Sequence, residues 1–379
     1  MKRVLVVIKG LGRGGAEQLL ATSARYYDRS RFDYEVAYLL PWKRALAGEL
    51  ENAGVPVTCL GAGSSAADMG WISQLRRLVR ERGIDLVHVH SPFVAATARS
   101  CLGGERPFVY TEHIEWGSYR RPTYWANLLT YGRNDHVFAV SERVRTSIRS
   151  ALGRGPLRFL PMPPVETLYH GLDPADVAAW QSSPGDRVAL GLPAEGPLVG
   201  VVANLRPQKG HRFLLEAAAV VCRRMPEVRF VIVGTGPLEG ELRRQALELG
   251  VGDRVVFAGF REDAPLLCRH FDLFVLPSLY EGLSIALLEA MALGRPCVVT
   301  DVGGVDELVT PERDAAVVPP ADPAALAAAV LRVLGDGGLR QRLGEAARRR
   351  AASFDIRTSV RRAEDVYESL LGVRDLRGA

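Results

Sequence analysis

The amino-acid sequence predicts an α/β protein made of two doubly wound domains. The chain has 379 residues, which is more than one hydrophobic core usually serves. Short apolar runs alternate with amphipathic segments along most of it, a pattern typical of parallel sheets with helices on both faces. The alternation stops over residues 160–197, where Pro, Gly, Asp and Ser are frequent, and then begins again. We therefore expect an interdomain connection there.

Six apolar runs predict the strands of the first domain. They are residues 4–8, 34–40, 55–60, 86–90, 108–113 and 136–140. Amphipathic segments lie between them, such as residues 71–83, in which Ile72, Leu75, Leu78 and Val79 share one helical face. Parallel strands need a crossover connection, and helices of this kind supply it.

The second half of the chain repeats the pattern. Its predicted strands are residues 198–205, 228–234, 254–260, 273–278 and 297–302. Predicted helices cover residues 211–224, 237–249 and 283–293, and the last fifth of the chain is helical. We expect the first domain to span residues 1–170 and the second to span residues 171–355. Ligands of open parallel sheets bind at the carboxyl ends of the strands, so a cleft between the domains is the expected site.

The composition is that of an ordinary soluble globular protein, with 47% hydrophobic and 24% charged residues. The net charge of +5 permits an acidic substrate or an anionic membrane surface but requires neither. The five cysteines are scattered, so neither a disulfide framework nor a zinc site is expected. The apolar run 4–8 is too short for a signal peptide, and no run approaches the length of a membrane span. We therefore expect a cytoplasmic protein, at most peripheral to a membrane.

Two carboxylates, Glu281 and Glu289, stand in the otherwise apolar segment 280–296. On one helix, eight residues span about 12 Å along the axis. The paired carboxyls of glycosidases lie about 5 Å apart in retaining enzymes and about 6.5–9.5 Å apart in inverting ones. Hydrolysis by this pair is therefore not expected.

The position of each acid indicates a different task. Glu281 lies on the loop after a predicted strand, and the amides near Gly282, Leu283 and Ser284 form a helix N-terminus that attracts phosphate. Glu289 lies two turns further along a helix that is apolar almost all round, so its carboxylate must be hydrogen-bonded. Ribose hydroxyls would satisfy it, and so would a core arginine or a neighbouring loop. The spacing alone leaves these interpretations equal.

Arg206 and Lys209 follow the first predicted strand of the second domain, at the same sheet edge as Glu281. Cationic side chains there would bind a diphosphate and stabilise negative charge on a departing nucleotide. An arginine and a lysine on a loop are otherwise usually solvated surface residues. The helix N-terminus on the same edge favours the phosphate interpretation.

Three motifs follow one another in the second half: Arg206-x-x-Lys209-Gly210, the glycine turn "VGTGP" (233–237), and a Glu-x7-Glu pattern in "EGLSIALLE" (281–289). In this order they resemble the retaining glycosyltransferases of family 4, which have the GT-B fold. The segment "GLGRGGAEQLL" (10–20) is similar to that family's first loop and helix. The resemblance covers most of the chain and is strongest over residues 198–310.

The resemblance implies two Rossmann-like domains that face each other across a cleft. Residues 1–170 would form the acceptor domain, and residues 171–355 would form the nucleotide-sugar-binding domain. The final helix, about residues 356–379, would pack back on the first domain. Its apolar positions recur at spacings of three and four and need a surface to cover. They are Val360, Ala363, Val366, Tyr367 and Leu370.

The resemblance also assigns roles in the second domain. Glu289 would hold the nucleotide ribose, Glu281 would contact the donor sugar, and Arg206 and Lys209 would bind the diphosphate. The other residues assigned to donor binding lie at the glycine turn, near the base and at the helix start: Gly234, Gly236, Arg261, Gly282, Leu283 and Ser284. The glycine turn lacks the third glycine of a dinucleotide fingerprint, so it gives little support to an NAD enzyme.

In the first domain, Gly14 and Gly15 precede a helix whose amides would approach the donor phosphate. From the residues alone, a strand–helix turn that needs glycine is an equal alternative. His113 ends a predicted strand, and the resemblance places it near the reacting centre, although a lone histidine there is more often structural. His170 stands at the hinge, where members of the family usually carry asparagine.

The activity implied is transfer of a sugar from a nucleotide sugar to an acceptor hydroxyl with retention of anomeric configuration. Family frequency favours UDP, and the acceptor would be a sugar, a lipid-linked sugar or a small molecule rather than a nucleic acid. No cofactor is expected, and no D-x-D motif occurs that would hold a metal on the diphosphate. Two alternatives stay open: another GT-B enzyme, such as a UDP-sugar epimerase or a phosphorylase, and a non-catalytic nucleotide-sugar-binding protein.

Two features of the first domain have less definite interpretations. His88 and His90 alternate on one predicted strand, and we expect them to point to opposite faces of the sheet, which argues against a metal site. The segment 116–125 is rich in aromatic and basic residues, which could contact acceptor, lipid head groups or nucleic acid. Packing of this loop on its own domain is the favoured interpretation. The residues are Tyr119, Arg120, Arg121, Tyr124 and Trp125.

Overall fold

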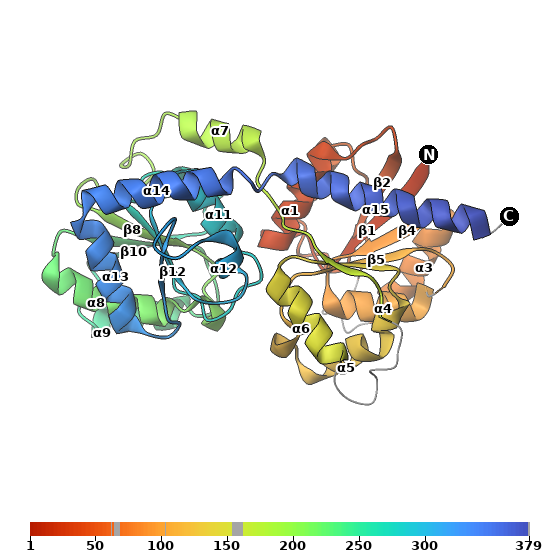
Figure 1. The fold of residues 1–379 in the computed structure, drawn as a ribbon, viewed down its shortest axis with the longest axis horizontal. Helices are drawn as coiled ribbons and strands as arrows, with labels where there is room; N and C mark the ends of the chain where they lie inside the picture. The colour runs from red at the N-terminus through yellow and green to blue at the C-terminus, as the bar shows by residue number, and fades with distance from the viewer. Residues whose placement is uncertain (62, 64–68, 103, 154–161, 378–379) are drawn as a thin grey trace. The chain divides into compact units, whose positions relative to one another are not determined.

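The computed structural model describes the chain apart from residues 62, 64–68, 103, 154–161 and 378–379. It divides into two compact units, one formed by Met1–His170 with Ile356–Ala379 and the other by Gly171–Asp355. Each unit is an α/β domain built on a parallel sheet (Figure 1). The predicted fold class, two doubly wound α/β domains, is confirmed.

The sheet of the first unit has the strand order β3-β2-β1-β4-β5-β6-β7. Its strands are β1 (Lys2–Ile8), β2 (Phe32–Tyr38), β3 (Val57–Cys59), β4 (Leu86–Val89), β5 (Phe108–Glu112), β6 (His136–Ala139) and β7 (Val165–Thr167). Every residue of β1 from Val4 to Ile8 is buried, because helices cover both faces of the sheet. This is why the strand is a continuous apolar run rather than an alternating one.

The helices of this unit connect successive strands. They are α1 (Gly15–Ser23), α2 (Ala47–Asn52), α3 (Trp71–Glu81), α4 (Pro92–Leu102), α5 (Arg121–Thr130) and α6 (Glu142–Leu152). The last helix of the chain, α15 (Ile356–Arg377), also belongs to this unit. In α3, Trp71, Leu75 and Val79 are buried at intervals of four residues. The predicted face of this helix therefore points into the core, with Trp71 added to it.

The sheet of the second unit has the strand order β10-β9-β8-β11-β12-β13. Its strands are β8 (Leu198–Val202), β9 (Arg229–Val233), β10 (Val255–Gly259), β11 (Leu273–Leu276), β12 (Cys297–Thr300) and β13 (Ala316–Val318). Its helices are α7 (Pro174–Ser182), α8 (His211–Arg224), α9 (Glu239–Glu248), α10 (Ala264–Cys268), α11 (Ile285–Ala292), α12 (Val305–Leu308), α13 (Pro323–Gly335) and α14 (Gly337–Ala351). The strand order reverses beside β8, so the loops after β8 and β11 form the edge where such sheets bind ligands.

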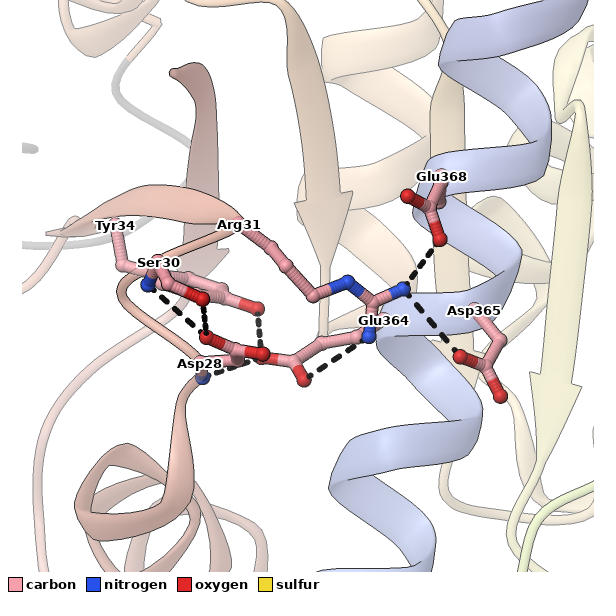
Figure 2. A network of polar contacts seen from close by, with 7 residues as sticks. All are labelled: Asp28, Ser30, Arg31, Tyr34, Glu364, Asp365 and Glu368. Carbon is pink, nitrogen blue, oxygen red and sulfur yellow. Dashed lines mark hydrogen bonds and ion pairs between the residues drawn. The ribbon is translucent and has the colours of Figure 1, made fainter.

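Helix α15 packs on the first unit through apolar and polar contacts. Val366, Tyr367 and Leu371 belong to the same buried cluster as Phe32 and other residues of β1 and β2. Figure 2 shows the polar part, in which Glu364 accepts hydrogen bonds from the Asp28 amide and the Tyr34 hydroxyl, each at 2.8 Å. Arg31 lies beside the same helix and pairs with three of its acids, at 3.9, 3.4 and 2.6 Å: Glu364, Asp365 and Glu368.

Residues 160–197 were expected to form an interdomain connection, and the two units divide within them, between His170 and Gly171. The described part of this segment also contains β7 and α7, which the sequence pattern did not predict. Strand β7 has three residues, too few to show a period. Helix α7 has nine residues and none of them is fully buried; its apolar contacts with the core are limited to the half-buried Val177 and Trp180, too few to show a period. Its start is nevertheless encoded locally, because the Asp173 carboxylate accepts a hydrogen bond from the Ala175 amide and Pro174 occupies the first turn.

None of the helices in the described part of the chain is both long enough and apolar enough to cross a membrane.

Candidate functional site

In the second unit, the loops after β8, β11 and β12 pack closely together. Gly210 has φ +65°, and a Cβ there would overlap the Pro277 carbonyl oxygen. Gly303 has φ +55°, and a Cβ there would overlap the Glu281 carbonyl oxygen. Both positions need glycine, because of the left-handed backbone and because of the close approach. These contacts bring the predicted site residues of different loops to one sheet edge.

Lys209 and Glu281 are in direct contact at this edge. The Lys209 ammonium lies 2.6 Å from Glu281 Oε1, and the Ser278 hydroxyl donates to the same oxygen at 2.7 Å. The Glu281 side chain is only 8% exposed and that of Lys209 22% exposed, so water screens this pair poorly. Ser278, which holds the acid, was not predicted as a site residue; its only sequence signal is its place at the end of a strand.

Arg206 lies three residues before Lys209 and is exposed. No acid among the described residues pairs with its guanidinium. Both of the predicted cations therefore stand on the loop after β8, one paired with Glu281 and one without an acidic partner among the described residues. Guanidinium and ammonium groups form charge-assisted hydrogen bonds with anions.

Helix α11 begins at Ile285, two residues later than the predicted helix, and Ser284 is its N-cap. The Ser284 hydroxyl accepts a hydrogen bond from the Leu287 amide at 3.4 Å. Gly282 and Leu283 therefore precede the helix rather than open it. The positive end of the helix still points toward the loop that carries Glu281.

Glu289 lies on α11 and is half-buried. Burial raises the pKa of its carboxyl to about 7, and the negative charge of Asp176 on α7 adds to this shift. No group in the described part of the chain donates a hydrogen bond to its carboxylate. A partly exposed acid without a protein partner is suited to accept hydrogen bonds from ligand hydroxyls.

The glycine turn after β9 has a structural reason of its own. Gly234 has φ +135° and donates its amide to the Gly259 carbonyl at 2.7 Å. A Cβ at Gly234 or Gly236 would overlap a carbonyl oxygen of the loop that leads to Arg206. Glycine at these two positions allows the turn to pack closely against that loop. This packing explains the two glycines without a bound nucleotide.

Arg261 uses its guanidinium within the unit. It makes a bidentate pair with Asp263, with distances of 2.7 and 2.6 Å, and donates to the Leu190 carbonyl at 2.8 Å. The guanidinium of Arg261 is therefore engaged by groups of its own unit. Phe260, beside it, is 47% exposed.

Gly14 and Gly15 lie at the start of α1, with Gly14 as N-cap. The carboxylate of Glu17 folds back over this start, where a Cβ on Gly14 would overlap it. Burial raises the pKa of Glu17, while a hydrogen bond from its own amide and the charge of Lys43 lower it. An acid thus lies over the helix start to which the resemblance assigned the donor phosphate.

His113 belongs to a cluster of four histidines in the first unit. The rings of His88 and His90 are 4.3 Å apart, so the expectation that they point to opposite faces was wrong. Residues two apart on a strand share a face. His90 Nδ1 lies 3.2 Å from His113 Nε2, and the ring of His113 stacks on that of His170 at 5.7 Å.

The segment 116–125 divides into buried and exposed parts. The Trp116 indole donates to the Glu112 carboxylate at 3.1 Å, and the Tyr119 hydroxyl also contacts that carboxylate. Trp125 on α5 is instead 56% exposed, and Leu129, one turn later, is 65% exposed. The structure therefore shows packing on the domain for the first part of the segment but not for Trp125.

Comparison with known proteins identifies the family. The model of the family "Glycosyl transferases group 1" matches residues 183–350, and that of "Glycosyltransferase Family 4" matches residues 13–176. The putative glycosyltransferase EpsF of Bacillus subtilis is 30% identical over 312 residues, which cover 79% of each chain. An Escherichia coli enzyme, UDP-Gal:alpha-D-GlcNAc-diphosphoundecaprenol alpha-1,3-galactosyltransferase, is 27% identical over 83% of this chain and 82% of its own.

Among solved structures, Anabaena HepE in complex with UDP-glucose superimposes with a TM-score of 0.84 at 26% identity. The match covers 98% of this chain and 100% of HepE. Both units of the present chain thus have counterparts in one known architecture. The matched proteins named here transfer sugars or are classed as glycosyltransferases, which does not favour an epimerase or a non-catalytic binding protein. The chain therefore belongs to the glycosyltransferases of the GT-B fold.

Proposed function

We propose that this glycosyltransferase moves a sugar from a UDP-sugar to an acceptor hydroxyl with retention of anomeric configuration. The observation that carries the proposal is the Lys209–Glu281 pair, with the exposed Arg206 on the same loop as Lys209. Glu289, which has no hydrogen-bond partner among the described residues, lies on the helix that follows the loop of Glu281. The choice of UDP is supported by HepE, whose structures contain UDP and UDP-glucose, and by the UDP-Gal-dependent E. coli relative.

In this proposal the unit Gly171–Asp355 binds the donor. Glu289 accepts hydrogen bonds from the ribose hydroxyls, and Arg206 and Lys209 bind the diphosphate at the start of α11. Lys209 holds Glu281 in place to contact the donor sugar. The backbone after β10 and the glycine turn after β9 border the nucleotide.

The first unit supplies the acceptor side of the reaction. His113 contacts the donor sugar near the reacting centre. The amides of Gly14 and Gly15 bind the donor phosphate after the Glu17 carboxylate moves away from the start of α1. The acceptor is a sugar, a lipid-linked sugar or a small molecule; the E. coli relative is named for a diphosphoundecaprenol-linked acceptor.

Retention follows if acceptor and leaving group use the same face of the sugar. The bond between the anomeric carbon and the diphosphate oxygen breaks while the bond to the acceptor oxygen forms on that face. The acceptor proton passes to the departing diphosphate oxygen, whose charge Arg206 and Lys209 stabilise. Thermal stabilisation of the purified protein by UDP, compared with GDP, ADP and TDP, tests the nucleotide. Proton NMR of the anomeric signal in donor and product tests retention, and an inverted product would overturn it.

Chelation is expected to leave turnover largely intact. The sequence lacks a D-x-D motif, and the described residues contain no group of three or more His, Cys, Asp or Glu side chains able to hold a metal. In this proposal Arg206 and Lys209 supply the positive charge at the diphosphate. The measurement is sugar transfer with and without EDTA. Loss of activity that Mg²⁺ or Mn²⁺ restores would contradict the cationic clamp.

The exposed face of α5 is proposed to contact an anionic membrane surface. Trp125 and Leu129 lie one turn apart on it, and the surrounding segment 116–134 has three arginines and no acid. Tryptophan and arginine together favour an interface of anionic lipid, with about 1 kcal/mol for each basic residue near it. The arginines are Arg120, Arg121 and Arg133, all exposed and without an ion-pair partner among the described residues.

We expect the protein to sediment with vesicles of equal parts phosphatidylcholine and phosphatidylglycerol and not with pure phosphatidylcholine. The double variant Trp125→Ser/Leu129→Ser should reduce the bound fraction severalfold. Leu247→Ser is the matched control, since Leu247 is 71% exposed on α9 in the other unit. Equal binding of the double variant and the wild type would show that this face is not the contact.

A further inference from the structure

The four histidines of the first unit are held in a definite order by their contacts. His88 is fixed at both ring nitrogens, by the Tyr367 hydroxyl at 2.5 Å and the Thr111 hydroxyl at 2.7 Å. The ring of His90 lies 4.3 Å from that of His88. His88 therefore supports His90, which in turn reaches the residue proposed to meet the donor sugar.

His113 is held on two sides by different kinds of contact. Its ring stacks on that of His170 with an interplanar angle of 13°. This stacking fixes the plane of the His113 ring but does not determine which of its two nitrogens carries the proton. His113 Nε2 lies 3.2 Å from His90 Nδ1, and no other hydrogen bond to a described residue distinguishes the two nitrogens. Two neutral rings in this arrangement share one proton, so one donates and the other accepts.

No described acid forms an ion pair with any of the four histidines, so no counter-charge among the described residues holds the cluster in a cationic form. Burial lowers the pKa of His90 and His113 well below the usual range, and the neighbouring histidines lower it further. The one acid among the residues lining the adjoining cavity of about 50 Å³ is Glu364, which is engaged by Tyr34 and the Asp28 amide. The histidines are therefore neutral, and the tautomer of His113 determines whether its free nitrogen donates a hydrogen bond to a ligand or accepts one.

We propose that His90 is a positioning residue for His113: His90 Nδ1 accepts the Nε2–H of His113 and leaves His113 Nδ1 as an acceptor for a sugar hydroxyl. Both rings then have the Nε2–H form that a neutral histidine side chain prefers. No described residue donates to His113 Nδ1, so that nitrogen is left for the ligand. The inference rests on the proposed function in one respect, the contact of His113 with the donor sugar.

The experiment compares two variants of the full chain. In His90→Asn, the side-chain oxygen takes the place of Nδ1 and can accept the same hydrogen bond. In His90→Phe, the ring is kept and the acceptor is lost. His170→Phe is the matched control, because it keeps the stacked ring and removes no hydrogen bond to His113. Thermal unfolding of each variant verifies that it is folded.

Two-bond ¹H–¹⁵N spectra of the labelled protein report the tautomer without any substrate. We expect the Nε2–H form of His113 in the wild type, His90→Asn and His170→Phe, and a mixture of forms in His90→Phe. With a working donor, kcat of His90→Phe should fall by about tenfold to a hundredfold, the scale of a misplaced reacting group. His90→Asn should restore most of it, and the UDP dissociation constant should be unchanged in both variants.

An Nδ1–H form of His113 in the wild type, or an unchanged tautomer in His90→Phe, overturns the inference. A shifted tautomer with unchanged turnover overturns it as well, because the hydrogen bond would then not serve the reaction. Failure of the proposed function is distinguishable: the protein would neither bind UDP nor transfer sugar, while the spectra would still report the tautomer.

Discussion

Replacing Arg206 with alanine is expected to lower kcat by about a hundredfold or more, the scale seen when one preorganised electrostatic donor is lost. The physical reason is that charge builds on the diphosphate oxygen as the glycosidic bond breaks. A cation at that position binds the transition state more strongly than the donor in its ground state. The donor KM should therefore change less than kcat, since Glu289 and the start of α11 still bind the nucleotide. Steady-state kinetics with a working UDP-sugar measures both.

Lys209→Ala is expected to lower kcat by a similar factor for two reasons. It removes positive charge from the diphosphate, and it leaves Glu281, which is 8% exposed, without its 2.6 Å partner. Removing one member of a poorly screened pair leaves a costly unpaired charge. The double variant Lys209→Ala/Glu281→Gln removes the unpaired acid, and the single variant Glu281→Gln measures the loss of the acid's proposed contact with the donor sugar. The cycle of the two single variants and the double variant separates the effects.

The matched control for these variants is Arg224→Ala. Arg224 is an exposed arginine at the far end of α8, the helix that follows the loop of Arg206 and Lys209. Its replacement should change neither kinetic parameter. If Arg206→Ala raises KM with kcat intact, the arginine contributes uniform binding only, and the proposed role in leaving-group departure is wrong.

Glu289→Ala is expected to weaken UDP binding about tenfold to a hundredfold, because hydrogen bonds to a charged group contribute about 1.5–3 kcal/mol. Its carboxylate has no donor in the described part of the chain, so the variant removes ligand contacts and breaks no intramolecular hydrogen bond. Calorimetry gives the dissociation constant. Glu248→Ala, which changes an exposed acid at the end of α9, is the control. An unchanged constant in folded Glu289→Ala would defeat the ribose assignment.

The pH dependence of binding gives a second test of Glu289. Burial raises the pKa of this carboxyl to about 7, so the free protein holds the proton at pH 6 and has lost it by pH 8. Ribose hydroxyls donate best to the ionised form, so UDP binding must release the proton and is weaker at low pH. With a pKa of about 7, the dissociation constant should fall about tenfold from pH 6 to pH 8 and then level off.

Glu289→Gln is neutral at every pH and should lose this dependence. Whatever pH dependence remains in the variant belongs to the UDP phosphates and to other groups of the protein. If the wild type and Glu289→Gln respond to pH in the same way, Glu289 does not titrate in the binding reaction.

The sequence was sufficient for the two-domain α/β fold because strands buried on both faces are continuous apolar runs, and β1 and β11 show this directly. It also predicted that Arg206, Lys209 and Glu281 lie at one edge, because residues that follow strands of a parallel sheet come to the same edge. Strand β7 and helix α7 could not be predicted from a periodic pattern. β7 has three residues and pairs with β6, and α7 begins at the Asp173 cap and contacts the core through Val177 and Trp180 alone among its apolar residues.

Contacts between residues far apart in the chain could not be predicted from patterns. The pairing of Lys209 with Glu281 joins residues 72 positions apart, and the histidine cluster joins His88 to Tyr367 across 279 positions. A periodic pattern reports which way a side chain points from its own strand or helix. Which partner it meets, and hence its charge state and its tautomer, depends on packing between elements, where burial and close approach set the strength of each contact.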